Sequence, residues 1–275
     1  MLYINTEFNK ARNIAYRGLL LTIQESKKQN NISEKVFQKR WIKKIQKTEA
    51  IIADGWYSPP PLGMAVLTDD INYPNRISFD SLRHEINWPS DKIINWETNL
   101  LYVYCSPVDI ESGIPGDIAV TLYFGNNPLV KEHFRKTYRA THEVIKELPL
   151  MKNSQELFIR SQEIFEKYRL RNCVISKTDQ TPLDLGHTLP QINNIVKPCL
   201  SNEQKVEISK ARKFINGDST WEFYEGMQFT IEPQLVSIDD GCMPQVSYHY
   251  VLEKKSDGFV LCNDVDSLIE EYHLK

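Results

Sequence analysis

A single carboxylate lies at the centre of the β-rich segment EGMQFTIEPQL, residues 225–235. Apolar and β-branched residues precede Glu232, and Pro233 follows it directly. Because proline cannot donate a hydrogen bond to a strand ladder, we expect the strand to be interrupted just after Glu232. A buried carboxylate is costly without a partner, which could be a metal cation or the side chain of a lysine or arginine. Glu232 is therefore the first candidate for a functional residue.

Three segments resemble metallopeptidase family M24, which includes methionine aminopeptidases, aminopeptidases P, prolidases and creatinase. GMQFTIEPQL resembles the family's Gly-Met-x-Phe-Thr-Ile-Glu-Pro segment, and LGHTLP at 185–190 resembles the Gly-His segment that precedes it. PGDIAVTLYFG at 115–125 resembles a strand in which an aspartate is followed by a threonine and a glycine. The resemblance implies one pita-bread domain over residues 1–275. This α+β fold has a curved, mainly antiparallel sheet covered by helices, with a pseudo-two-fold internal repeat.

The resemblance also implies a metal site. The family's site holds two divalent metals between two aspartates, a histidine and two glutamates, and the metals activate a water and polarise the scissile carbonyl. Carried over residue by residue, one aspartate falls on Asp117, the histidine on His187 and one glutamate on Glu232. Oxygen-rich ligation with one imidazole suits Mn, Fe, Co or Zn.

The other two carboxylates of the family's set are missing. Where the first aspartate is expected, spacing gives Ser106 and the strand pattern gives Tyr104. In the segment QVSYHYVL, Tyr248 or Ser247 takes the position of the last glutamate. None of these residues replaces a bridging carboxylate well, so a two-metal centre is not expected.

His249 is adjacent to the position of the missing glutamate. Successive strand residues point to opposite faces, so His249 can replace the glutamate only if the register shifts by one residue. We expect one divalent transition metal (Fe, Mn, Co or Zn) at Asp117, His187 and Glu232, with open positions for water or substrate and with His249 or a tyrosine completing the set. A vacant site with a purely structural role is the alternative.

His84 is a further candidate catalytic residue. It lies in RHEINWPSD, just before a stretch that resembles the substrate-contacting histidine segment of the aminopeptidases, although the family's histidine aligns with Asn87. His133 and His142 fall on a predicted helix, and we expect them to be surface residues.

The elements that must position these residues follow from periodicity and from turn residues. Apolar residues at three- and four-residue steps predict a helix over 6–29, and Asn31 is the expected cap of the next helix. Asn127 and Pro128 predict the start of a helix that reaches about residue 148. Another helix is expected over 155–169, and residues 196–222 are expected to be mostly loop. The predicted strands are 65–67, 76–79, 100–105, 118–124, 229–236, 245–253 and 258–262.

The composition of the chain limits the kinds of binding partner that we expect. The sequence is 41% hydrophobic with a net charge of -3, and its basic residues are spread out, so we expect no nucleic acid and no anionic membrane as partner. No run approaches the roughly 18 apolar residues of a membrane helix. The five cysteines form no CxxC pair and are odd in number, which favours a reduced, cytoplasmic setting.

Three functions stay open. The first is an M24-type metal-dependent enzyme, an aminopeptidase-like hydrolase or a derived activity, acting on a small amino-acid or peptide-like substrate. The second is a metal-free, creatinase-like enzyme in which His187 is the general base and Glu232 orients it. The third is a non-catalytic binding protein that keeps the fold. Members of the family are monomers or dimers, so a homodimer is possible.

Overall fold

The computed structural model describes residues 1–5, 7–29, 31–72, 74, 76–97, 99–174, 181, 183–193, 195 and 199–274. The chain divides into two compact units. Unit 1 comprises residues 1–6, 126–189 and 212–275, and unit 2 comprises residues 7–125 and 190–211. Within the described residues, no helix has the length and apolar character needed to cross a membrane.

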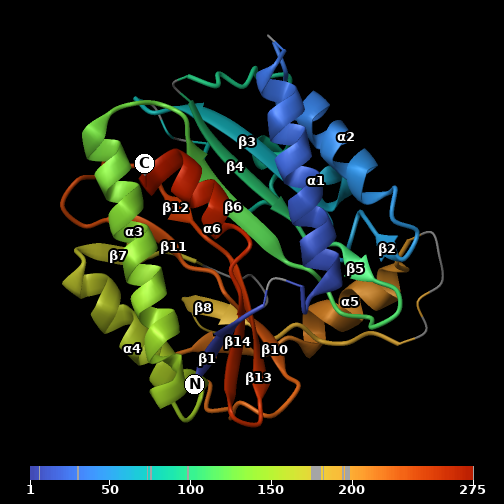
Figure 1. The fold of residues 1–275 in the computed structure, drawn as a ribbon, viewed down its shortest axis with the longest axis vertical. Coiled ribbons are helices and arrows are strands. Elements are labelled where there is room, and N and C mark those ends of the chain that lie inside the picture. The colour runs from blue at the N-terminus through green and yellow to red at the C-terminus, as the bar shows by residue number, and fades with distance from the viewer. Residues whose placement is uncertain are drawn as a thin grey trace. The chain divides into compact units, whose positions relative to one another are not determined.

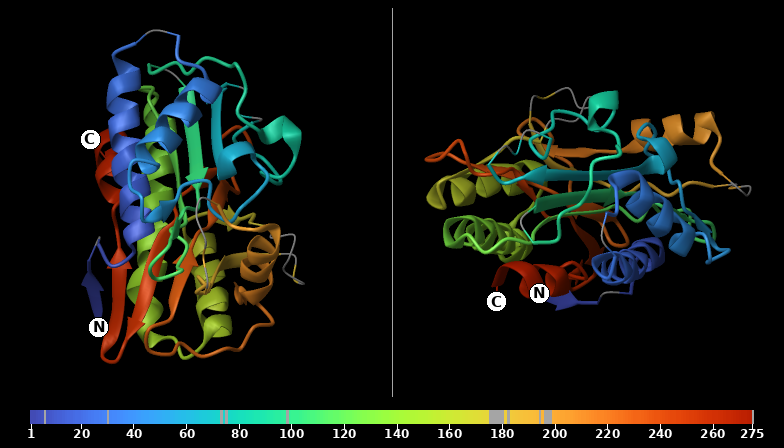
Figure 2. Two further views of the ribbon diagram at one scale, coloured as in Figure 1. Left: turned by 90° about the vertical axis from the view of Figure 1, so that its right-hand side faces the viewer. Right: turned by 90° about the horizontal axis from the view of Figure 1, so that it is seen from above.

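Unit 2 packs helices against an antiparallel sheet whose described strands are ordered β3-β4-β6. Its helices α1 and α2 lie side by side (Figure 1, Figure 2), α1 against β6 and α2 against β3. The bounds are α1 (Lys10–Lys27), α2 (Glu34–Ile45), β2 (Ile51–Ile52), β3 (Met64–Asp70), β4 (Asn99–Cys105), β5 (Val108–Asp109), β6 (Ile118–Tyr123) and α5 (Asn202–Ala211), with 3-10 turns at Pro61–Gly63 and Glu85–Asn87.

The caps of the first two helices follow ordinary rules. The side chain of Asn9 accepts a hydrogen bond from the backbone N–H of Arg12, which fixes the start of α1. Thr6, where we predicted the helix to begin, lies outside the described residues. Ser33 caps α2, so the prediction of Asn31 as cap was wrong: Asn31 precedes the helix with a φ of 67°.

Two other predictions in unit 2 need correction. Residues 76–79 form a turn, because the backbone N–H of Arg76 donates to the Asp69 carboxylate instead of to a strand. The segment 196–222 contains helix α5, whose Ile208 is buried. Ile208 belongs to an apolar cluster with Ile52, Trp56, Val108, Ile192 and Leu200.

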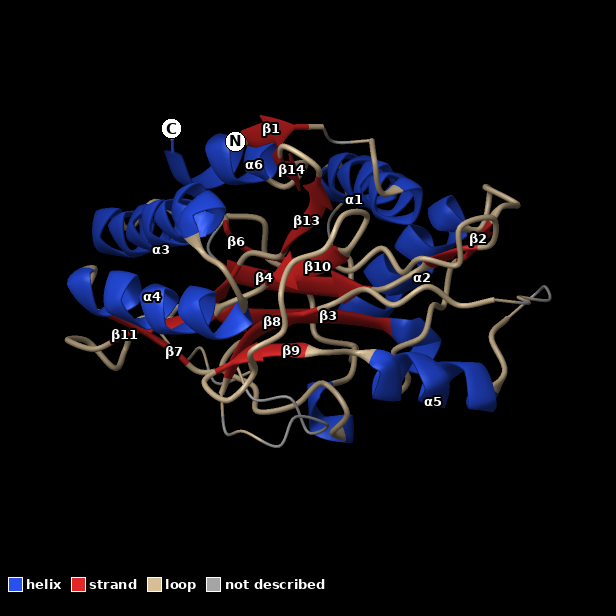
Figure 3. Ribbon diagram, turned by 90° about the horizontal axis from the view of Figure 1, so that it is seen from below, coloured by secondary structure: helices blue, strands red, loops and turns tan. Residues whose placement is uncertain are grey.

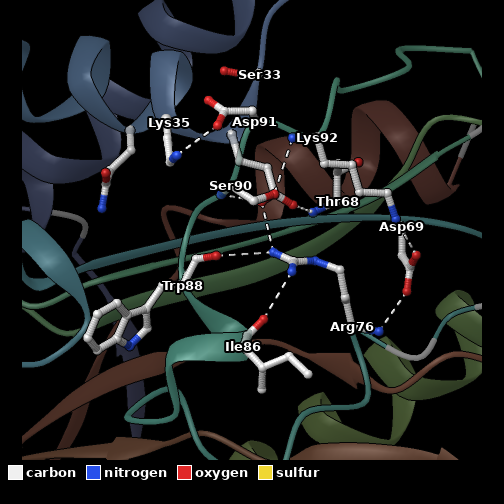
Figure 4. Close-up of polar contacts among 12 residues, drawn as sticks. Ser33, Lys35, Thr68, Asp69, Arg76, Ile86, Trp88, Ser90, Asp91 and Lys92 are labelled. Atoms are coloured by element: carbon white, nitrogen blue, oxygen red, sulfur yellow. Dashed lines mark hydrogen bonds and ion pairs between the residues drawn. The ribbon is translucent and has the colours of Figure 1, made fainter.

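The carboxylate of Glu34 is fully buried and ties α2 to the chain that follows β3. Figure 4 shows Thr68, Arg76 and Ser90, which donate hydrogen bonds to it. Its Oε1 accepts from the backbone N–H of Thr68 at 2.6 Å. Its Oε2 accepts from Arg76 Nη2 at 2.8 Å and from the N–H and hydroxyl of Ser90 at 2.8 and 2.7 Å. Hydrogen bonds to an ionised acceptor are stronger than neutral ones, so this network holds the segment 76–90 in place.

Unit 1 carries helices α3 and α4 side by side (Figure 3), and α4 packs on β7, β8 and β9. Its described strands form sheets ordered β1-β14-β13-β10, β12-β11-β7 and β8-β9. Among these described pairs only β1 and β14 run parallel. The bounds are β1 (Leu2–Ile4), α3 (Pro128–Glu147), α4 (Ser154–Lys167), β7 (Leu170–Asn172), β8 (Asp184–His187), β9 (Phe214–Asn216), β10 (Gln228–Ile231), β11 (Gln234–Ser237), β12 (Val246–Ser247), β13 (Tyr250–Lys255), β14 (Gly258–Cys262) and α6 (Asp266–Ile269), with a 3-10 turn at Leu148–Leu150 and a π-helical turn at Glu270–Leu274.

Local signals in unit 1 are confirmed. Asn127 caps α3 by accepting from the N–H of Leu129, and Pro128 occupies the first helical position. The predicted strand over 229–236 is split into β10 and β11, and the interruption falls at Glu232 and Pro233 as the proline predicts.

Candidate functional site

The candidate site of unit 1 begins where β8 runs beside β10. The backbone N–H of His187 donates to the Thr230 hydroxyl at 3.0 Å, and the N–H of Glu232 donates to the carbonyl of Leu185 at 2.9 Å. Gly186 allows this approach, because a Cβ at that position would lie 2.2 Å from the carbonyl oxygen of Thr230. The Gly-His sequence therefore brings His187 onto the strand next to Glu232.

His249 reaches the same carboxylate through the register of the neighbouring strands. Ile231 pairs with Tyr250 on one side of the interruption, and Gln234 pairs with Ser247 on the other. The register is the same on both sides, so Glu232 lies opposite His249. The two positions predicted for the last ligand do not face Glu232 in this register. Tyr248 is the neighbour of His249 in the sequence, and Ser247 pairs with Gln234.

These residues form a cluster around the carboxylate of Glu232. His187 Nε2 lies 3.5 Å from Glu232 Oε1, and His249 Nδ1 lies 3.3 Å from Glu232 Oε2. All three side chains are at most one-tenth exposed. We call His187, Glu232 and His249 the imidazole–carboxylate cluster.

The tautomer of His187 follows from its second ring nitrogen. His187 Nδ1 lies 2.9 Å from the carbonyl oxygen of Thr188. A carbonyl only accepts, so Nδ1 carries the proton and a neutral ring presents the lone pair of Nε2 toward Glu232. Burial, together with the positive charge of Arg212, lowers the pKa of His187 well below its ordinary value. His187 is therefore a neutral imidazole with a fixed tautomer at neutral pH.

Arg212 is a cation next to this cluster that the sequence did not reveal. Its guanidinium carbon lies 5.0 Å from the centre of the Phe214 ring, a cation–π distance. Phe214 packs edge-on against the His187 ring, with centroids 6.0 Å apart. A lone arginine in a polar segment carries no sequence signal of its own, and only the pairing of β8 with β9 brings it here.

Asp117 belongs to unit 2 and is buried there. Tyr104 donates its hydroxyl to Asp117 Oδ1 at 2.8 Å. The fully buried guanidinium of Arg12 donates to the backbone carbonyl of Asp117. Burial raises the pKa of the Cys105 thiol. The negative charge of Asp117 raises this pKa further, and the positive charge of Arg12 lowers it.

Three further histidines have contacts of their own. His84, in unit 2, is 45% exposed at its side chain and lies 3.1 Å from Asp80, and Asn87 is buried with its amide on Ser81. The prediction that His133 is a surface residue was wrong. His133 is buried and its Nε2 donates to the carbonyl of Pro244, while His142 is half-buried.

The sequence matches no family model and no curated protein. Solved structures do match. The X-Pro aminopeptidase of Thermotoga maritima MSB8 superposes with a TM-score of 0.61 at 14% identity, over 92% of this chain and 58% of that one. The chain has the fold of these peptidases. A prolidase from Pyrococcus furiosus gives 0.59 at 16% identity, over 92% and 61% of the two chains. Methionine aminopeptidase from Rickettsia prowazekii gives 0.61 at 17% identity, over 95% and 99%.

The comparison confirms the predicted pita-bread fold, with helices and a mainly antiparallel sheet. The chain spans less than two thirds of the X-Pro aminopeptidase and prolidase, but nearly all of the methionine aminopeptidase. At these identities the likeness concerns the fold, so activity has to be argued from the side chains.

The residues of this chain do not fit the family's two-metal centre. One of the family's carboxylates is expected at Ser106 or at Tyr104, neither of which is a carboxylate, and the hydroxyl of Tyr104 is a hydrogen-bond donor to Asp117. Within the imidazole–carboxylate cluster, each imidazole contacts a different oxygen of Glu232. Among the described residues, no group of three or more His, Cys, Asp or Glu side chains could hold a metal ion. The single metal predicted from the resemblance stays a prediction.

Proposed function

We propose that this protein is an enzyme of the aminopeptidase and creatinase fold that uses His187 as a general base. The observation that carries the proposal is the fixed tautomer of His187, whose Nδ1–H is held by the Thr188 carbonyl while Nε2 faces Glu232. A general base needs a lone pair with a defined direction, and this arrangement supplies it.

The cluster can accept and hold one proton. When Nε2 takes a proton from a water or from a substrate, the imidazolium lies 3.5 Å from the Glu232 carboxylate. Opposite charges about 4 Å apart near a protein surface attract by on the order of 4 kcal/mol, so Glu232 stabilises the protonated base. His249, at the other oxygen, restrains the carboxylate.

We propose a substrate of the amino-acid or short-peptide class. The fold supports this class, since its solved neighbours are named as aminopeptidases and prolidases. Arg212 adds a reason within this chain, because a guanidinium beside the base suits a substrate carboxylate. His84 and Asp117 stay candidates from the sequence, for catalysis and for metal binding respectively.

The test is turnover of a panel of dipeptides, amino-acid amides and N-acyl amino acids, with and without EDTA. We expect His187→Gln to lower kcat by roughly 10²- to 10⁴-fold, the usual contribution of a general base, and EDTA to leave turnover unchanged. His133→Gln is the matched control, since His133 is equally buried but contacts only structural groups. Equal turnover by His187→Gln and the wild type would refute the assigned base.

A one-metal enzyme is the second candidate, because His187 and Glu232 are the histidine and glutamate that the resemblance assigns to the metal site and they lie in contact. Elemental analysis of the purified protein separates the two candidates. A stoichiometric Fe, Mn, Co or Zn content that falls in His187→Ala but not in His133→Ala would favour the metal enzyme over the metal-free one.

A further inference from the structure

His249 lies between two short strands. Strand β12 ends at Ser247 and β13 begins at Tyr250. The register of these strands places His249 opposite Glu232. The two neighbouring tyrosines add side-chain anchors to this placement.

Tyr248 and Tyr250 flank His249 and point to the opposite face, as residues on either side of an extended position do. Both are fully buried. The hydroxyl of Tyr250 donates to Asp266 Oδ1 at 2.7 Å. The hydroxyl of Tyr248 lies 3.1 Å from His273 Nδ1, at hydrogen-bond distance. Each tyrosine is thus fastened to the C-terminal helical segment, 266–274.

The anchors on that segment are themselves held. Asn263 donates to Asp266 Oδ2 at 3.1 Å, and His142 of α3 lies 3.1 Å from the hydroxyl of Tyr250. His273 is fully buried against the ring of Phe134, with centroids 4.3 Å apart. Burial, with nearby Lys131 and Arg135, lowers the pKa of His273 to about 3, so its contact with Tyr248 joins neutral groups at ordinary pH.

We propose that Tyr248 and Tyr250 are positioning residues, which hold His249 against Glu232 by hydrogen bonds to His273 and Asp266. Tyr250 is fixed by its backbone in β13 and by its hydroxyl on Asp266, and Tyr248 is fixed by its hydroxyl at His273. Together they restrain the backbone at His249, which lies between them. The helical segment 266–274 thereby helps to set the geometry of the proposed acid–base site. This inference rests on the proposed function, because it assigns the cluster to acid–base chemistry. Its test does not require turnover of a substrate.

The test uses the ring ¹⁵N resonances of histidine in the full-length protein without substrate. The sequence has six histidines, and the spectrum of His249→Gln assigns the signal of His249. We expect Tyr250→Phe and Tyr248→Phe each to shift the His249 signals more than those of His84 or His133. Tyr168→Phe is the matched control, because it also removes a phenol hydrogen bond to a carboxylate, that of Glu143 at 2.9 Å. The control should leave the His249 signals in place.

A second pair of variants separates positioning from general loss of stability. Asp266→Asn keeps an oxygen that can accept from Tyr250, so its His249 signals should stay closer to the wild type than those of Asp266→Ala. Unchanged His249 signals in both folded tyrosine variants would overturn the proposal. Shifted signals in a protein that turns over no member of the substrate panel would support the positioning and refute the proposed function instead.

Discussion

Replacing Glu34 by glutamine is a sensitive test of how unit 2 is held together. Glu34 is fully buried and accepts four hydrogen bonds, three of them on Oε2 and one on Oε1. An amide keeps one acceptor oxygen and places an NH₂ group where the other was. If the oxygen stays at the Oε2 position, the buried N–H of Thr68 faces a donor and loses its acceptor.

The cost can be summed from these contacts. An unsatisfied buried donor costs about 1–3 kcal/mol. Loss of the charge on Glu34 weakens a hydrogen-bonded ion pair with Arg76, whose side chain is 23% exposed, by about 1–2 kcal/mol. We therefore expect Glu34→Gln to lower the free energy of unfolding by about 2–5 kcal/mol.

Urea unfolding followed by tryptophan fluorescence measures this change. Glu25→Gln is the matched control, because Glu25 pairs with Lys44 at 2.7 Å but its side chain is 52% exposed. An exposed ion pair contributes about 0–1 kcal/mol, so the control should stay near the wild type. A Glu34→Gln protein as stable as the Glu25→Gln protein would refute the view that this network anchors the segment 76–90.

Two further predictions concern unit 1. Burial lowers the pKa values of His133, His187 and His273, so the unfolded chain binds more protons than the folded one just below pH 6.5. The free energy of unfolding should therefore be highest above pH 6.5 and fall below it by up to about 4 kcal/mol per pH unit. A flat urea midpoint between pH 6.5 and 5 would contradict this. Gly186→Ala places a Cβ 2.2 Å from a backbone oxygen and should cost several kcal/mol, roughly 3 or more, in the same assay. Gly241→Ala, which meets open space, should change stability by about 0.5 kcal/mol or less.

Local signals in the sequence predicted local structure well. The Asn127–Pro128 pair placed the start of α3, and Pro233 placed the interruption after Glu232. Both are short-range effects, since a cap and a missing N–H act within a few residues. The three segments that resemble the metallopeptidases predicted the fold in a different way, through their resemblance to a known family.

Where the sequence failed to predict the structure, the cause is contacts between residues far apart in the chain. Residues 76–79 have the composition of a strand, but Arg76 is drawn to Asp69 and Glu34 by buried polar contacts that no local pattern contains. His249 faces Glu232 because of a strand register set by residues on both sides of the interruption. The charge of Arg212 acts on His187 only because the fold brings the two residues together. The residues next to Arg212 in the sequence do not indicate this proximity.

The charges of this chain differ from those that a two-metal site needs. Two metal dications require several carboxylates to balance them. In unit 1, Glu232 contributes one negative charge between two imidazoles, and the cation of Arg212 acts on the same cluster. In unit 2, the negative charge of Asp117 and the buried cation of Arg12 both act on Cys105. Each carboxylate thus already has a protein cation or imidazole nearby, and the two dications of the family's site would meet repulsion from these arginines. The carboxylates that the family's set would have at Tyr104 or Ser106, and at Tyr248 or Ser247, are absent as well. The negative charge is therefore lower still, which also disfavours a two-metal centre.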